Sequence, residues 1–132
     1  MIANSVLAYD SQLRVTATGT TVGAAQAKGT ATDLRLVVNA SPDGATAVGG
    51  STAVAVQGSN VTVSASSNWT AVTPDKGTLA AITASGGQAV HLAQLQYAYY
   101  RVQLVAATTA TADVNTVFDF QGIADSTLNT VQ

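Results

Sequence analysis

Cysteine is absent from this 132-residue chain, which excludes disulfide bonds, thiolate metal sites and cysteine nucleophiles. Glutamate is absent as well, so the seven acidic residues are all aspartates, and none are spaced like the ligands of a calcium-binding loop. Histidine occurs once, as His91, and cannot build a site that needs two histidines from one chain. We therefore predict neither a metal nor a cofactor.

Catalytic motifs are also missing from the sequence. A serine–histidine–aspartate arrangement would have to use His91, but no nucleophile-elbow pattern is present. The glycine pairs Gly49-Gly50 and Gly86-Gly87 lack the lysine and the strand–loop–helix context of a phosphate-binding loop. We expect a protein without enzymatic activity and without a small-molecule substrate.

Charge is scarce: charged residues make up 9% of the chain, and the formal net charge is −2. Without a basic excess, nucleic-acid binding is disfavoured, and no Lys/Arg cluster is available to bind an anionic membrane. No apolar run approaches the roughly 20 residues of a membrane span. Residues 1–10 contain no positive charge and do not resemble a secretory signal, so we expect synthesis in a cytoplasm.

The hydrophobic fraction of 47% consists largely of alanine and valine, and aromatic residues make up only 5%. Burial of apolar area contributes about 25 cal/mol per Å², so a buried alanine adds little stability. Ordering each residue costs about 1–2 kcal/mol in backbone entropy. A domain of such small side chains has a thin margin of stability, and we predict that it associates with copies of itself or with a partner.

Short alternating runs rich in valine and threonine recur between Gly/Ser-rich turns, which is typical of strands in a sandwich. The runs are 13–18, 34–39, 52–57, 61–63, 69–73, 79–83, 99–106 and 114–120, whereas 89–95 fits a strand or a helical turn. We read 19–29 as a connection, and 41–44 and 74–77 as turns. The chain is predicted to be one all-β domain over 1–132, an antiparallel sandwich of about eight strands in the jelly-roll form.

Alternation also predicts which side chains face the core. Leu34, Leu36 and Val38 share one face of their run, and Tyr100, Val102 and Leu104 share one face of theirs. Arg101 falls on the opposite, outward face, where its substitution should cost under about 1 kcal/mol outside an interface.

The interface candidates are the larger aromatic residues and the chain ends. Tyr97 and Tyr99 are expected on the outward face, and Trp69 fits a core position and an interface position equally well. Residues 1–6 are predicted to be a flexible arm and 121–132 a flexible tail. In that arm, Ile2 and Asn4 could add as an edge strand to a neighbouring subunit, or the arm could simply fray.

Three stretches, in this order, resemble a known family. They are Tyr9–Gln12 followed by the 13–18 run and Asp33–Val38, then Gly49–Thr52 leading into Val54–Ser59, and finally Tyr99–Leu104 followed by Thr109–Ala112 and the 114–120 run. Their order and spacing are similar to those of the small jelly-roll cement (decoration) proteins on the heads of tailed bacteriophages. The Ser/Val-rich stretch 60–68 and the segment after Phe120 depart from that pattern.

The resemblance implies a homotrimeric jelly roll on the outside of the virion capsid, made in the host cytoplasm. Its partner would be the major capsid protein, with the subunit clamping neighbouring capsid subunits together. The alternative is a carbohydrate- or protein-binding β-sandwich module of the adhesin type, with Trp69 and Tyr97 as contacts, although an aromatic content of 5% leaves few rings for a sugar platform.

Overall fold

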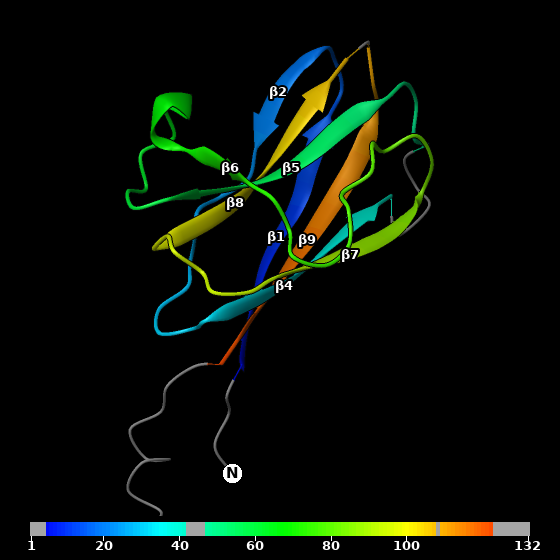
Figure 1. Ribbon diagram of the computed structural model, residues 1–132. Coiled ribbons are helices and arrows are strands. Elements are labelled where there is room, and N and C mark those ends of the chain that lie inside the picture. Colours follow the sequence, from blue (N-terminus) through cyan, green and yellow to red (C-terminus); the bar gives the residue numbers. More distant parts are fainter. Residues whose placement is uncertain (1–4, 42–46, 108, 123–132) are drawn as a thin grey trace, which may run out of the picture.

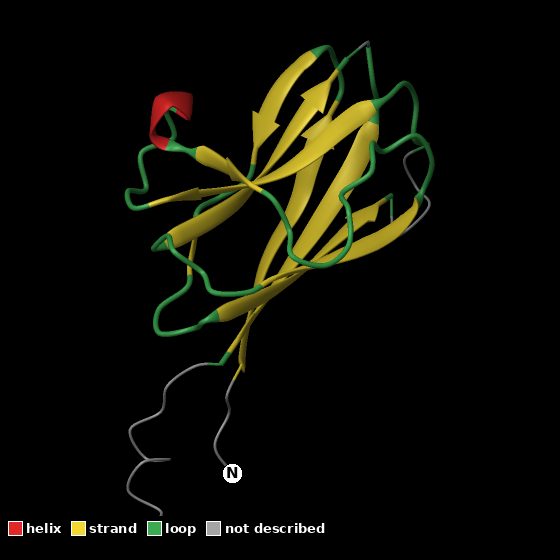
Figure 2. Cartoon of the chain, viewed as in Figure 1, coloured by secondary structure: helices red, strands yellow, loops and turns green. Residues whose placement is uncertain are grey.

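The computed structural model describes residues 5–41, 47–107 and 109–122, and gives the backbone alone for residues 5–12. Within these residues the chain forms strands and one short 3-10 helix (Figure 2). The strands are β1 Ser5–Val15, β2 Gly19–Val22, β3 Gln26–Ala27, β4 Asp33–Ala40, β5 Thr52–Ser59, β6 Thr70–Val72, β7 Gly86–Leu92, β8 Tyr99–Ala106 and β9 Ala112–Gln121, and the helix η1 is Ser66–Asn68. The predicted all-β class is confirmed.

Two antiparallel sheets pack face to face (Figure 1). One, here the β9 sheet, has the order β1-β9-β4-β7, and the other, the β8 sheet, has the order β2-β8-β5-β6 with β3 added beside β8. The pairs β1·β9, β2·β8, β4·β7 and β5·β6 join early strands to late ones in nested order. This nesting is the jelly-roll topology, so the predicted fold form is confirmed as well.

The core between the sheets contains the large apolar side chains that alternation placed there. Leu34, Leu36 and Val38 of β4 are buried, as are Val102 and Leu104 of β8. Every second residue of β9 is buried too, and the rings of Phe118 and Phe120 stack with centroids 6.1 Å apart. Burial of these side chains supplies most of the apolar area that holds the sheets together.

Several predicted elements differ in the structure. The predicted connection 19–29 contains β2 and β3, and the ambiguous segment 89–95 is strand β7 as far as Leu92. The predicted strands 61–63 and 79–83 are loops, and Ile82 makes only an isolated bridge to Thr52. A short alternating run becomes a strand only where a partner strand lies along it; in the described residues 61–63 pairs with no strand, and 79–83 meets β5 at Ile82 alone.

Three residues of the predicted arm and tail belong to strands: Ser5, Val6 and Gln121. Ser5 pairs with Gln121 and Val6 pairs with Phe120, so the pairing extends to the first residue of β1 and the last residue of β9. The arm predicted at 1–6 and the tail predicted at 121–132 are therefore too long, because Ser5, Val6 and Gln121 belong to strands. Residues 1–4 and 123–132, and residues 42–44 of the predicted turn 41–44, lie outside the described residues.

Leu104→Asp is expected to abolish soluble folding, because Leu104 is 0% exposed and the carboxylate would lie unpaired in the core. Leu36→Asp should do the same. The neighbouring Val105, 37% exposed on the other face of β8, provides the control, and Val105→Asp should cost under about 1 kcal/mol. Soluble yield and circular dichroism measure the difference; a native-like Leu104→Asp protein would contradict the assignment of the inner face.

Candidate protein interface on the β8 sheet

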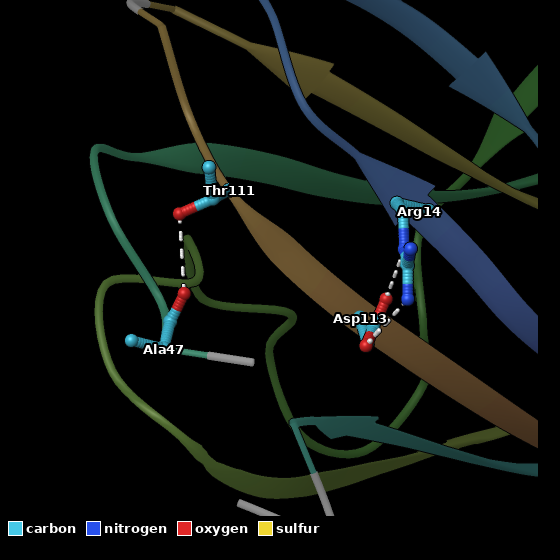
Figure 3. A network of polar contacts seen from close by, with 4 residues as sticks. All are labelled: Arg14, Ala47, Thr111 and Asp113. Carbon is cyan, nitrogen blue, oxygen red and sulfur yellow. Dashed lines mark hydrogen bonds and ion pairs between the residues drawn. The ribbon is translucent and has the colours of Figure 1, made fainter. Parts of the chain in front are cut away.

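The outer face of the β9 sheet carries most of the charged side chains described on the strands. Arg14 of β1 forms a two-pronged ion pair with Asp113 of β9, with Nε–Oδ1 at 2.8 Å and Nη2–Oδ2 at 3.2 Å (Figure 3). His91 Nε2 of β7 lies 3.8 Å from Asp33 Oδ2 of β4. Exposed pairs of this kind contribute little stability, but they keep this face hydrated.

A side-chain contact beside the ion pair fixes the start of β9. The Thr111 hydroxyl donates a hydrogen bond to the Ala47 carbonyl at 3.1 Å, and Thr111 also pairs with Gly49 through backbone bonds (Figure 3). These contacts join the segment before β9 to the segment before β5, which closes one end of the sandwich.

The outer face of the β8 sheet is different in character. Its exposed and half-buried residues form two rows across β5, β8 and β2. One row is Ala53, Val105 and Thr20, and the other is Ala55, Gln103 and Val22. We call these six residues the neutral face: Thr20, Val22, Ala53, Ala55, Gln103 and Val105. None of them is charged, and depletion of charged residues is characteristic of the centre of protein interfaces.

One end of this sheet holds a buried cation. Arg101 projects to the outer side of β8, as predicted, but it is only 2% exposed, because the segment 60–69 covers it. Its guanidinium carbon lies 4.2 Å from the centroid of the Trp69 ring. Nε donates to Gln57 Oε1 at 2.8 Å, and Nη1 donates to the Ser64 carbonyl at 3.1 Å. We call these four residues the Arg101 cluster.

The environment of the guanidinium is unusual, because it contains no acidic partner among the contacts described. Desolvation by burial lowers the pKa of Arg101, although an arginine remains charged at any physiological pH. Nη2 is buried and has no hydrogen-bond partner in the described residues. The charge is balanced by the ring face of Trp69 and by two neutral oxygens, which is a costly way to hold a cation.

Trp69 lies inside its own chain rather than on the surface. It is 7% exposed, and its indole Nε1 donates to the Val63 carbonyl at 2.8 Å. Its ring stacks on Arg101 at the outer side of the β8 sheet, beneath the 60–68 segment. The sequence left Trp69 equally suited to core and interface; the structure places it in a small second cluster outside the main core.

Tyr97, Tyr99 and Tyr100 lie at the end of β8 nearest Asn60. The rings of Tyr97 and Tyr100 meet edge to face at 6.2 Å, and the Tyr100 hydroxyl accepts the backbone N–H groups of Gln96 and Tyr97. The Tyr97 ring packs so closely on Gly58 that no side chain would fit there. Tyr97 and Tyr99 also line an open cavity of about 380 Å³.

The remaining sequence candidates are placed as follows. Ile2 and Asn4 lie outside the described residues. In the part of the chain that is described, no group of three or more His, Cys, Asp or Glu side chains could hold a metal ion. No helix among the described residues is long and apolar enough to cross a bilayer.

Sequence reasoning missed the Arg101 cluster. Alternation predicts on which face of the sheet Arg101 lies, but it does not predict that another segment covers that side chain. Two features of the sequence point to it in retrospect. Arg101 is the only charged residue in β8, and Trp69 is the only tryptophan of the chain. A cation in an otherwise neutral sheet is stabilised by contact with the face of an aromatic ring, so these two features together indicate a contact between Arg101 and Trp69.

Comparison with known proteins adds little to this picture. No protein-family model matches the chain. No curated protein matches it. Among solved structures, one described as the crystal structure of PirA is similar over 90% of this chain and 95% of that chain, with 10% sequence identity and a TM-score of 0.41. A likeness of this degree carries no inference about function.

The sequence predicted that replacing an exposed Arg101 would cost under about 1 kcal/mol of stability. Because Arg101 is buried, we expect a larger loss. Arg101→Ala should lower the free energy of unfolding by about 2–4 kcal/mol, because it opens a cavity and leaves Gln57 and the Ser64 carbonyl without their donor. Arg35→Ala, on the exposed face of β4, is the control and should cost under about 0.5 kcal/mol. Urea denaturation measures both; equal effects would contradict the structural role of the cluster.

Proposed function

We propose that this protein is a structural subunit that decorates the head of a tailed bacteriophage by binding neighbouring major capsid subunits from outside. The observation that supports the proposal is the asymmetry of the two outer faces. The β9 sheet carries Arg14, Asp33, Arg35 and Asp113, whereas the neutral face of the β8 sheet carries no charge. The order of sequence segments that resembles head decoration proteins supports it independently.

The neutral face suits close contact with a protein lattice. Alanine, valine and threonine side chains lose little rotamer freedom on burial, and a face without charges loses no charge solvation when a partner covers it. The charged face would remain turned to solvent. A subunit that binds the assembled lattice but not loose capsid subunits stabilises the shell by mass action.

The second candidate is a carbohydrate-binding module, and one observation favours it. Tyr97 and Tyr99 line the open cavity together with Lys28, Asn60 and Gln96, which supply an aromatic wall and polar groups of the kind that sugars contact. Trp69, the other aromatic residue considered for this role, is buried. Glycan binding that Tyr97→Ala abolishes, with no binding to shells, would favour this candidate.

The capsid proposal is tested with empty expanded shells assembled from the major capsid protein of the same genome. The protein should sediment with these shells, and Ala53→Asp on the neutral face should weaken its affinity by about tenfold or more, because an unpaired charge would enter the interface. Ala89→Asp is a matched control, since Ala89 is also an exposed strand alanine but lies on the β9 sheet. Failure of the wild type to bind, or equal loss in both variants, would refute the proposal.

Self-association is a further part of the proposal. We expect a homotrimer, in which contacts between copies supplement a core that contains few large apolar side chains. Light scattering coupled to size exclusion should give three times the chain mass at micromolar concentration. A folded monomer under these conditions would contradict this expectation.

A further inference from the structure

The segment Asn60–Asn68, here the 60–68 loop, projects from the end of the β8 sheet and carries η1 (Figures 1 and 2). Every residue of this loop is exposed, and η1 buries no residue. Val61 and Val63 are 44% and 58% exposed, which makes them the most exposed large apolar residues in the described chain. The side chains of the loop therefore add almost nothing to the folded core.

The backbone of the same loop, in contrast, is held at consecutive residues. Trp69 Nε1 donates to the carbonyl of Val63 at 2.8 Å, and Arg101 Nη1 donates to the carbonyl of Ser64 at 3.1 Å. At its start, Asn60 Oδ1 accepts the backbone N–H of Ala98 at 3.1 Å. At its end, the N–H groups of Asn68 and Trp69 close the turns of η1. These bonds fix the shape of the loop and leave the side chains of Val61 and Val63 exposed.

The contacts that hold the loop are costly. Arg101 gives up its hydration without gaining an acidic partner among the described contacts, and its Nη2 is buried without a hydrogen bond there. A loop that only had to connect β5 to β6 could be shorter and would need no buried cation. A buried donor without a partner calls for an explanation, and binding residues are often carried on loops that a rigid scaffold positions.

We infer that the 60–68 loop is a pre-shaped recognition loop that inserts Val61 and Val63 into an apolar depression on the major capsid subunit. The inference rests on the proposed function and names the contact that the neutral face alone does not provide. The loop is continuous with that face, since Gln57 and Arg101 lie in the same outer rows of β5 and β8 as Ala55 and Gln103. Fixing the loop before binding reduces the entropy lost on association.

The composition of the loop points to a protein as its partner. It contains no charged residue, so it cannot neutralise phosphates, and it contains no aromatic residue on which a sugar or a base could stack. Its serine, threonine and asparagine side chains offer adaptable hydrogen bonds around two apolar contacts. An uncharged protein surface with a small apolar depression is the complementary partner.

The test compares Val61→Ser/Val63→Ser with the wild type on the same empty expanded shells. We expect about tenfold or greater weakening of affinity, as for loss of contacts at an interface centre, with an unchanged thermal midpoint because both valines are exposed. Val37→Ser, a valine on the outer face of the β9 sheet, is the control and should bind as the wild type does.

The possible outcomes separate the inference from the proposed function. If the double variant binds normally while Ala53→Asp loses binding, the loop is not a contact and the inference is overturned, although the capsid proposal stands. If the wild type does not bind the shells, both fall. If the double variant loses self-association but still binds shells, the loop contacts a second copy, which also overturns the inference.

A second variant tests whether the fixed shape of the loop matters. Trp69→Phe keeps an aromatic ring against Arg101 but removes the donor to the Val63 carbonyl. We expect weaker shell binding and faster hydrogen exchange in residues 61–66, with the exchange of β5 and β8 unchanged. If exchange in the loop rises and shell binding does not fall, the loop does not act as a pre-shaped contact.

Discussion

The scarcity of large apolar side chains is the constraint on which this structure depends. Leu34, Leu36, Leu92, Leu104, Phe118 and Phe120 are all fully or nearly fully buried between the sheets, so few large residues remain for the outside. The outer faces are consequently built from what is left, which is a small number of charges and many residues with small side chains. The two outer faces, one charged and one neutral, are built from these remaining residues.

Arg101 shows how a single residue can depart from that division. Its position in β8 assigns it to the outer, neutral side, where an exposed cation would interrupt the face. The structure covers it with Trp69 and with the backbone of the 60–68 loop, so its charge does not reach the surface. Neutrality of the β8 sheet is therefore a property of packing as well as of composition. Arg101 in turn helps to hold the 60–68 loop in its shape, because it donates a hydrogen bond to the Ser64 carbonyl.

Sequence patterns predicted the parts of the fold in which alternation is long and has a partner strand. The faces of β4, β8 and β9 follow directly from the periodicity of Leu36, Leu104 and Phe118. The same reasoning predicted a strand at Val61–Val63, because alternation alone does not reveal whether a neighbouring strand exists. It missed β2, which has no pattern of large apolar residues and forms because β8 lies beside it. The Arg101 cluster joins β5, β8 and the 60–68 loop, and no local pattern contains such long-range contacts.

The nested strand order has a consequence for how the chain reaches this fold. β1 pairs with β9, so among the described strands the earliest in the sequence has no sheet partner until the latest has been made. Among the paired strands that the structure describes, β5 and β6 are the closest in sequence. Contacts between distant residues make folding slow, since the closure entropy of long loops must be overcome before the contacts form. The sheet of β1, β9, β4 and β7 is therefore complete only once β9 has been made, whereas β4 can pair with β7 before that point.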